Sequence, residues 1–363
     1  MTDKLNIAVL GYGTVGKTLV DLIDAHEEAL GLHVKYVLRR PGKAAGSRMV
    51  DNVETILRDV DVAAVVDVLP GRDPSLSLIR DALAARLSVV SANKAALAAD
   101  LLVLEALAQQ AGVHLLYEAA CGGGMPCVEA IKKAARFDEI RAMSGILNGT
   151  CNFMIDAMAT EHLTFAAALS QAQTLGYAEA NPKADISGED VRNKAIIATS
   201  IAFHGAVNPH FPVSGIEGLE LAMLERLAND GKCLRLMMLA RAEGQRYAVG
   251  VAPIILSATA QPAHIRRNLN FLSMEGHVVG PLTFSGQGAG GRPTADAIIQ
   301  DLITLRNKTA ERPTFTRELV YDPTLITGVA YINGQRLENV TLEAATVAAQ
   351  RQSQFLAFEP SVA

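Results

Sequence analysis

A glycine-rich turn near the start of the chain limits the fold more than any other feature. The short apolar run Asn6–Leu10 predicts a buried strand, a Gly-x-Gly-x-x-Gly turn follows it directly, and Lys17–Ile23 has the apolar spacing of a helix. Glycines in this turn let a pyrophosphate approach the N–H groups at the helix N-terminus. This order predicts a dinucleotide-binding unit. The residues expected to bind the cofactor here are Gly11, Gly13, Thr14, Val15 and Gly16.

The end of the second predicted strand, His33–Leu38, bears on the choice of cofactor. NAD-binding chains usually place an acidic residue about 20 residues past the glycine turn, where it binds the ribose 2′-hydroxyl. Arg39 and Arg40 stand at this edge instead. A guanidinium can bind a 2′-phosphate through paired charged hydrogen bonds, so NADP is favoured over NAD. The alternative is a solvated arginine pair in a surface loop.

Strand and helix patterns continue to alternate after this point. Val62–Leu69 is a nearly continuous apolar run of the kind that forms a parallel strand covered on both faces, and Leu87–Val90 predicts the next strand. Ligands of parallel sheets bind at the carboxyl ends of the strands. Ser91 and Lys94, which follow the second of these strands, are therefore expected to face a ligand. The alternative for Lys94 is an ordinary lysine at the start of a helix.

A second glycine-rich loop follows the strand predicted at Val113–Tyr117. It reads Glu118-Ala-Ala-Cys-Gly-Gly-Gly-Met-Pro126 and leads into a helical pattern. Three consecutive glycines expose backbone carbonyls, which together with the Glu118 carboxylate can ligate a hard cation. Glycine at a close contact between a strand and a helix is the commoner explanation.

A charged span lies between two apolar-rich runs in the middle of the chain. It contains Glu179, Asp185, Asp190 and Lys194. We expect a helix to begin near Ser187, which can cap it, so that Asp190 and Lys194 share one helix face four residues apart. Charge between buried elements indicates a site. The alternative is an exposed helical ion pair of little energetic consequence.

Composition excludes several classes of partner. The chain has 363 residues, which suggests about two domains, and a net charge of -5 with both signs interspersed. Proteins that bind nucleic acid or membrane surfaces carry basic patches, so neither is expected as a partner. The four cysteines form neither a Cys-x-x-Cys pair nor a secreted disulfide framework. We therefore expect a cytoplasmic protein that binds small metabolites and copies of itself.

The patterns predict an α/β protein with two folded domains and two smaller segments. Residues 1–140 are expected to form an NAD(P)-binding Rossmann-type domain and residues 141–285 a second domain of the α+β class. Residues 286–310 predict a helix that returns to the nucleotide domain, because glycines and Pro293 precede a helical run. Residues 311–363 form an extension of unknown role, with a hairpin turn at Asn333-Gly334 and an amphipathic stretch at Leu342–Gln354.

The motifs, taken together, resemble those of the homoserine dehydrogenases from about Asn6 to about Ile303. They are Gly11–Gly16, Ser91–Lys94, Glu118–Pro126, Gly145–Thr150, Gly176–Glu179 with Asp185, Gly188, Asp190 and Lys194, and Gly288–Ala295. The glycine turn is generic, but this combination in this order is highly specific. The resemblance implies reversible NAD(P)-dependent interconversion of L-homoserine and L-aspartate 4-semialdehyde, on the route to threonine and methionine. It also implies that residues 141–285, the middle domain, bind the substrate and form a homodimer.

The resemblance also implies a role for each site residue. Lys94 and Lys194 are expected to bracket the reacting oxygen, and the sequence leaves open which of them exchanges the proton. Glu179 is the position that binds the substrate ammonium. The other implied residues are Asp190 and Asp185 beside Lys194, Tyr177, Gly149 and Thr150 around the substrate, and Gly288 at the cofactor.

Two departures from the family pattern are present. Cys121 occupies a place often held by valine, in a loop that binds a sodium or potassium ion in relatives through Glu118 and the carbonyls of Cys121, Gly123 and Met125. Leu69–Pro74 replaces a usual glycine pair. The tail after Arg306 is too short for the family's regulatory ACT module, so threonine inhibition through such a module is not expected.

Two other functions are compatible with parts of the sequence. A semialdehyde dehydrogenase would use Cys121 or Cys151 as a nucleophile with a histidine base beside it, and no nearby histidine is evident. An NADP-binding sensor could have kept the fold and lost turnover. The presence of Lys94, Glu179, Asp190 and Lys194 together argues against the sensor.

Overall fold

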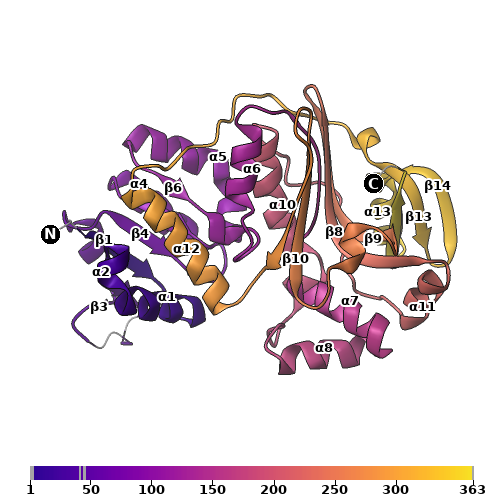
Figure 1. Ribbon diagram of the computed structural model, residues 1–363, viewed down its shortest axis with the longest axis horizontal. Coiled ribbons are helices and arrows are strands. Elements are labelled where there is room, and N and C mark those ends of the chain that lie inside the picture. Colours follow the sequence, from indigo (N-terminus) through magenta and orange to yellow (C-terminus); the bar gives the residue numbers. More distant parts are fainter. Residues whose placement is uncertain (1–3, 41, 44–45, 362–363) are drawn as a thin grey trace. The chain divides into compact units, whose positions relative to one another are not determined.

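The computed structural model describes residues 4–40, 42–43 and 46–361, and Figure 1 labels many of its helices and strands. The chain forms two compact units. One consists of Met1–Val128 with Ala289–Pro313, and the other of Glu129–Gly288 with Thr314–Ala363. Within the described ranges, no helix combines the length and apolar character needed to span a membrane.

The first unit is built on a six-stranded sheet in the order β3-β2-β1-β4-β5-β6, and every recorded pairing in it is parallel. The order reverses between β1 and β4, which is the arrangement of a dinucleotide-binding Rossmann fold. The expected fold class is confirmed. The strands are β1 (Leu5–Leu10), β2 (Leu32–Leu38), β3 (Met49–Val50), β4 (Ala64–Asp67), β5 (Ser88–Ser91) and β6 (Leu115–Leu116).

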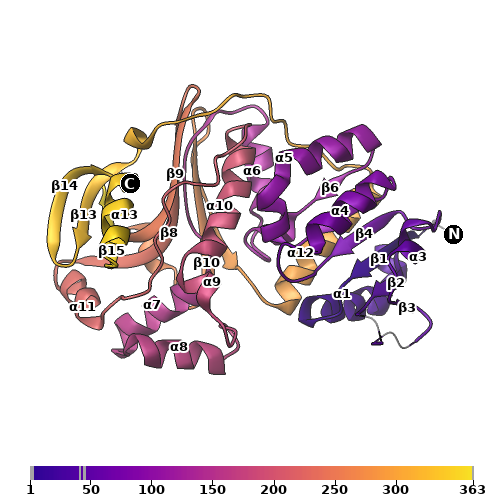
Figure 2. The same cartoon turned by 180° about the vertical axis from the view of Figure 1, so that it is seen from behind.

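Helices cover this sheet in two pairs. Helix α1 packs against α12, and α4 packs against α5 (Figures 1 and 2). Because right-handed crossovers run in opposite directions from the point where the strand order reverses, the helices that follow β1 and β4 cover opposite faces. The helices are α1 (Thr14–Ala25), α2 (Glu27–Leu30), α3 (Glu54–Leu57), α4 (Ser75–Ala84), α5 (Lys94–Ala111), the 3₁₀ turn η1 (Glu118–Ala120) and α12 (Gly291–Arg306).

The second unit is built on a mixed nine-stranded sheet. Its strands run in the order β11-β10-β7-β8-β9-β15-β13-β14, and β12 pairs with β9 off this path. The long strands β8, β9 and β10 are visible in Figure 1. The strands are β7 (Ile140–Ile146), β8 (Lys232–Glu243), β9 (Arg246–Ser257), β10 (Leu269–Gly276), β11 (Gly280–Gln287), β12 (Val320–Tyr321), β13 (Thr327–Ile332), β14 (Gln335–Thr341) and β15 (Leu356–Pro360).

The two faces of this second sheet have different cover. Helix α10 packs on β8 and β9, whereas the other face carries a buried cluster in which Met237, Ala248 and Phe271 meet the C-terminal residues Leu342 and Phe358. The helices and turns are α6 (Val128–Ala135), α7 (Gly149–Glu161), α8 (Phe165–Thr174), α9 (Lys183–Ile186), α10 (Glu189–Ala202), α11 (Leu221–Asn229), η2 (Gln261–His264), η3 (Pro323–Leu325) and α13 (Leu342–Arg351).

Two local expectations need correction. Ser187 does not cap α10, because the N-cap is Gly188, whose φ of 85° is left-handed and whose neighbour Ser187 ends α9. The strand predicted at Val113–Tyr117 is only Leu115–Leu116, since Tyr117 already leads into η1. The hairpin turn at Asn333-Gly334 is confirmed, with φ values of 48° and 75° between β13 and β14.

Candidate functional site

The glycine turn of the first unit has the geometry of a phosphate cradle. A Cβ on Gly16 would lie 2.3 Å from the carbonyl oxygen of Gly11, so only glycine lets the turn close on the helix. Helix α1 begins at Thr14 with Gly13 as its N-cap, and no side chain accepts a hydrogen bond there. The first-turn N–H groups of Thr14 and Val15 therefore suit a phosphate, and the residues fit a dinucleotide.

Arg39 lies beside this turn. Its guanidinium carbon is 5.4 Å from the centre of the Tyr12 ring, between the first two glycines, and the Gly11 N–H donates to the Leu38 carbonyl. The end of β2 and the glycine turn are therefore held together. Arg40 is exposed. A cation at this edge of the sheet suits a 2′-phosphate.

Asp67, at the end of β4, organises the next two loops of this edge. It is fully buried, and its carboxylate accepts hydrogen bonds from Ser75 at 2.5 Å and Ser91 at 2.9 Å. Burial raises the pKa of the Asp67 carboxyl. Asn93 caps α5 and donates to the carbonyls of Leu69 and Gly71. The sequence predicted no role for Asp67 or Asn93, although a lone acid inside the apolar run Val62–Leu69 was a usable signal.

Lys94 is the first residue of α5, directly after the Asn93 cap, and is partly buried. Its position follows from the cap: the Asn93 side chain accepts from the Ala96 N–H, which fixes the first turn. The ordered loop that precedes the helix therefore fixes the backbone position of Lys94. This placement at the carboxyl end of β5 is the one that the sequence predicts.

Glu118 lies at the start of the second glycine loop, and its side chain caps the helix that follows the loop. Its Oε1 accepts the N–H groups of Cys127 at 2.6 Å and Val128 at 3.2 Å, which hold the start of α6. The loop between Glu118 and α6 makes a tight turn. In this turn the Met125 N–H donates to the Gly122 carbonyl, and Gly123 has a φ of 59°. Across the described ranges, no group of three or more His, Cys, Asp or Glu side chains is placed to hold a metal. Any cation here would rely on backbone carbonyls with Glu118.

In the second unit, Lys194 and Asp190 form a buried ion pair. Their side chains are 8% and 6% exposed, and Lys194 Nζ lies 2.8 Å from Asp190 Oδ2. The same Nζ donates to the Leu147 carbonyl at 2.6 Å, just past the end of β7. The pair is therefore desolvated and held in place, which excludes the expected alternative of a solvated helical ion pair.

Asn148 connects this pair to Asp185. Its Nδ2 donates to Asp190 Oδ2 at 2.9 Å and to Asp185 Oδ1 at 2.7 Å, while its Oδ1 caps α7 by accepting the Cys151 N–H. One amide thus orients two carboxylates and one helix end. Asn148 belongs to the motif Gly145–Thr150, but the sequence alone predicted no role for it.

The residues predicted to surround the substrate lie at the start of α7 and in the segment before α9. Thr150 Oγ1 donates to the Tyr177 carbonyl at 2.6 Å, and the Tyr177 ring lies 5.0 Å from that of Phe153. Gly149 is at the helix N-terminus, where a Cβ would lie 2.7 Å from the Asn268 carbonyl. Glu179 is exposed, so its carboxylate is open to solvent and to a ligand.

Cys151 lies inside this cluster but is not arranged as a nucleophile. Its Sγ donates to the Asp185 carbonyl at 3.3 Å, and burial, with Asp185 and Asp190 nearby, raises the pKa of the thiol well above its ordinary value. Nucleophilic cysteines need a lowered thiol pKa.

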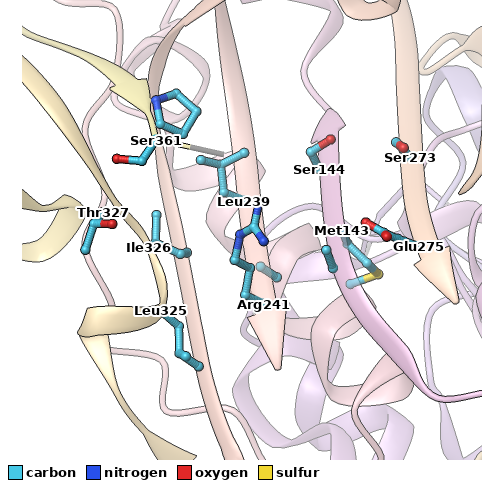
Figure 3. Close-up of a pocket in the computed structure, with 13 residues that line it drawn as sticks. Met143, Ser144, Leu239, Arg241, Ser273, Glu275, Leu325, Ile326, Thr327 and Ser361 are labelled. Atoms are coloured by element: carbon cyan, nitrogen blue, oxygen red, sulfur yellow. The ribbon is translucent and has the colours of Figure 1, made fainter. Parts of the chain in front are cut away.

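A groove of about 150 Å³ lies elsewhere on the second unit (Figure 3). Arg241, Ala142 and Glu275 form one row across β8, β7 and β10, and Leu239, Ser144 and Ser273 form another on the same face. A Cβ on Gly188, at the start of α10, would lie 3.5 Å from Val251. Val251 pairs with Met238, which lies between Leu239 and its other neighbour on β8 and so faces the opposite side of the sheet from Leu239. The groove is therefore on the face opposite α10, and none of the predicted site residues lines it.

Comparisons with known proteins match this chain over most of its length. A family model described as the homoserine dehydrogenase NAD-binding domain matches residues 11–118, and one described as homoserine dehydrogenase matches residues 126–303. The homoserine dehydrogenase of Corynebacterium glutamicum is 33% identical, over 84% of this chain and 73% of its own length. The homoserine dehydrogenase of Mycobacterium tuberculosis is 35% identical, over 82% of this chain and 71% of its own length.

Solved structures agree. A homoserine dehydrogenase from Thiobacillus denitrificans superposes with a TM-score of 0.84 at 28% identity, covering 90% of this chain and 82% of the other. A hyperthermophilic archaeal homoserine dehydrogenase in complex with NADPH shares the fold, with a TM-score of 0.72 at 22% identity over 86% and 100% of the two chains. The chain therefore belongs to the homoserine dehydrogenase family, NAD(P)-dependent oxidoreductases that act on a hydroxyl group.

Proposed function

We propose that the Lys194–Asp190 pair handles the proton when L-homoserine and L-aspartate 4-semialdehyde are interconverted. The burial of this pair is the observation that carries the proposal, because an ammonium in a desolvated site stabilises a developing alkoxide far better than one in water. The Leu147 carbonyl and Asp190 fix Nζ, so little reorganisation is needed at the moment of reaction. Lys94 is the second lysine of the proposed reaction.

The amino-acid end of the substrate is assigned to neighbouring residues of the same unit. Glu179, an exposed carboxylate, would bind the ammonium. The N–H groups of Gly149 and Thr150, at the start of α7, suit the carboxylate. Tyr177, held by Thr150, would form the wall, and Asp185 is oriented by Asn148.

Replacing Glu179→Gln tests the substrate assignment. Loss of the charged partner is expected to raise KM for L-homoserine by about 10-fold or more, as for other hydrogen bonds to a charged group, with KM for NADP unchanged. Glu189→Gln is the control, because Glu189 is also exposed and pairs with Arg192 on α10. An unchanged KM for homoserine in Glu179→Gln would refute the assignment.

NADP is the proposed preferred cofactor. Bound at the glycine turn, it would exchange the hydride, and Arg39 and Arg40 would bind its 2′-phosphate. Arg39 is already held over Tyr12 beside the turn, which supports the assignment. Ser91 and Gly288 complete the proposed cofactor contacts.

A monovalent cation is also proposed at the second glycine loop. Glu118 with the carbonyls of Cys121, Gly123 and Met125 would ligate sodium or potassium, and carbonyl ligands tolerate a cysteine at position 121. The tight turn at Gly123 supports a converging set of carbonyls. Loss of turnover in sodium- and potassium-free buffer, restored by either ion, is the expected result, and full turnover without them would contradict it.

We further propose a homodimer, formed through the second unit in the cytoplasm. The C-terminal residues cover part of one face of its sheet, whereas Ser144, Leu239 and Ser273 of the same face remain partly exposed. Two serines and one leucine at these positions suit isologous packing of two sheets.

A further inference from the structure

Asn270, on β10, is buried without hydrogen bonds. Its exposure is 0%, and neither Nδ2 nor Oδ1 has a hydrogen-bond partner among the described residues. An unsatisfied buried polar group costs about 1–3 kcal/mol relative to a satisfied or apolar one. An asparagine at this position therefore does not serve stability, and its amide needs another explanation.

The amide lies directly against Gly288. A Cβ on Gly288 would be 1.9 Å from Cγ, 2.0 Å from Nδ2 and 2.1 Å from Oδ1 of Asn270, and these are its three nearest atoms. Gly288 is buried, comes directly after β11 and is the last residue of the second unit before the chain returns to the first at Ala289. Asn270 thus contacts the peptide segment that joins the two units.

Asn270 also lies next to the end of β7, where the chain contacts Lys194. Phe271 pairs with Ile146 in the antiparallel register, which places Asn270 across from Leu147. The Leu147 carbonyl is the acceptor for Lys194 Nζ. Asn270 therefore has Leu147, which holds the proposed catalytic Lys194, on one side and Gly288, which leads to the first unit, on the other.

We propose that Asn270 is a positioning residue that sets the orientation of the Gly288 peptide groups and, through them, of the nicotinamide end of the cofactor. The amide has a donor and an acceptor, both unused among the described residues, so both are available to the Gly288 carbonyl and N–H when the cofactor is bound. This inference rests on the proposed contact of Gly288 with the cofactor. It predicts that the amide acts on the nicotinamide and leaves the adenosine end alone.

Binding of two ligands to Asn270→Ala tests the inference. The dissociation constants of NADPH and of 2′-phospho-ADP-ribose, which lacks the nicotinamide ring, are measured for the variant and for wild type. NADPH binding is expected to weaken about tenfold while the ring-less ligand changes less than about twofold. Equal weakening of both ligands would show a structural role and overturn the proposal.

A double variant separates chemistry from packing. Gly288→Ala alone should lower the thermal midpoint, because its Cβ overlaps the Asn270 amide. In Asn270→Ala/Gly288→Ala the space is restored, so the midpoint should recover while the NADPH defect remains. Recovery of NADPH binding as well would mean that the amide only fills space, and the proposal would be wrong.

Ser273→Ala is the matched control, since Ser273 lies on the same strand with its side chain on the opposite face. It should bind both ligands like wild type. These binding measurements need no turnover, so they are distinct from a failure of the proposed reaction, which an assay with L-homoserine would reveal in wild type.

Discussion

Lys194 depends on residues that are distant in sequence. Its partners are Asp190, one helical turn away, and Leu147, on another element, and Asn148 links Asp190 to Asp185. The sequence predicted the charged residues because polar side chains between apolar runs are a local signal. It did not predict the roles of Asn148 or Asn270, because their importance comes from contacts that only the fold creates.

Cys151 gives a prediction at the same scale. Its raised thiol pKa keeps the thiolate fraction low as the pH rises through the ordinary range for cysteine, so iodoacetamide at pH 8 should leave Cys151 unmodified in the native protein and modify it in urea. Mass spectrometry of the peptide reads this out. Cys151→Ser should keep homoserine oxidation, whereas an inactive variant would support the cysteine-dependent dehydrogenase instead.

The start of α10 is the element that positions the ion pair. Gly188, with φ 85°, follows the end of α9 at Ser187 and is the N-cap of α10, so Asp190 lies in the first turn and Lys194 in the second. Acidic residues near a helix N-terminus are stabilised by the helix dipole. The sequence predicted the helix and its acidic first turn. It missed the cap because a left-handed glycine and a serine cap are equally compatible with the pattern.

Two glycine substitutions test this element. Gly188→Ala and Gly176→Ala both place an alanine at positive φ, 85° and 75°, and each should lose about 1–2 kcal/mol of unfolding free energy. Only Gly188→Ala meets a neighbour, with Val213 3.1 Å from the new Cβ, so only it should displace α10 and reduce turnover. Chemical denaturation and kcat give the two readouts. Equal kcat values would show that the helix start does not set the site.

At the level of the whole molecule, the sequence pattern predicted the alternating strands and helices but not how the C-terminal tail joins the second sheet. Alternating strands and helices predicted the first unit, and glycine-punctuated segments after Ile140 marked a change of architecture. The hairpin and amphipathic helix of the tail were predictable from local spacing. The addition of β13, β14 and β15 to the second sheet was not predictable from the sequence. It depends on the pairing of β15 with β9 at Phe358 and Ile254, which are distant in sequence.

The open part of this sheet predicts the oligomeric state. Wild type should sediment with twice the mass of the chain, and Ser144→Arg should give a monomer, because it inserts a charge into the centre of the proposed interface. Ser170→Arg, on the exposed surface of α8, is the control and should stay dimeric. A monomeric wild type, or a dimer that survives Ser144→Arg, would place the interface elsewhere.

The buried lysine is tested most directly by reduced-nicotinamide formation from L-homoserine at alkaline pH. NADP and NAD are compared for wild type, Lys194→Ala and Lys183→Ala, an exposed lysine of α9. Turnover that is faster with NADP, unchanged in Lys183→Ala and reduced about 100-fold or more in Lys194→Ala is the predicted result. Full turnover in Lys194→Ala would contradict the role of the buried pair, and no turnover in wild type despite NADP binding would point to a sensor.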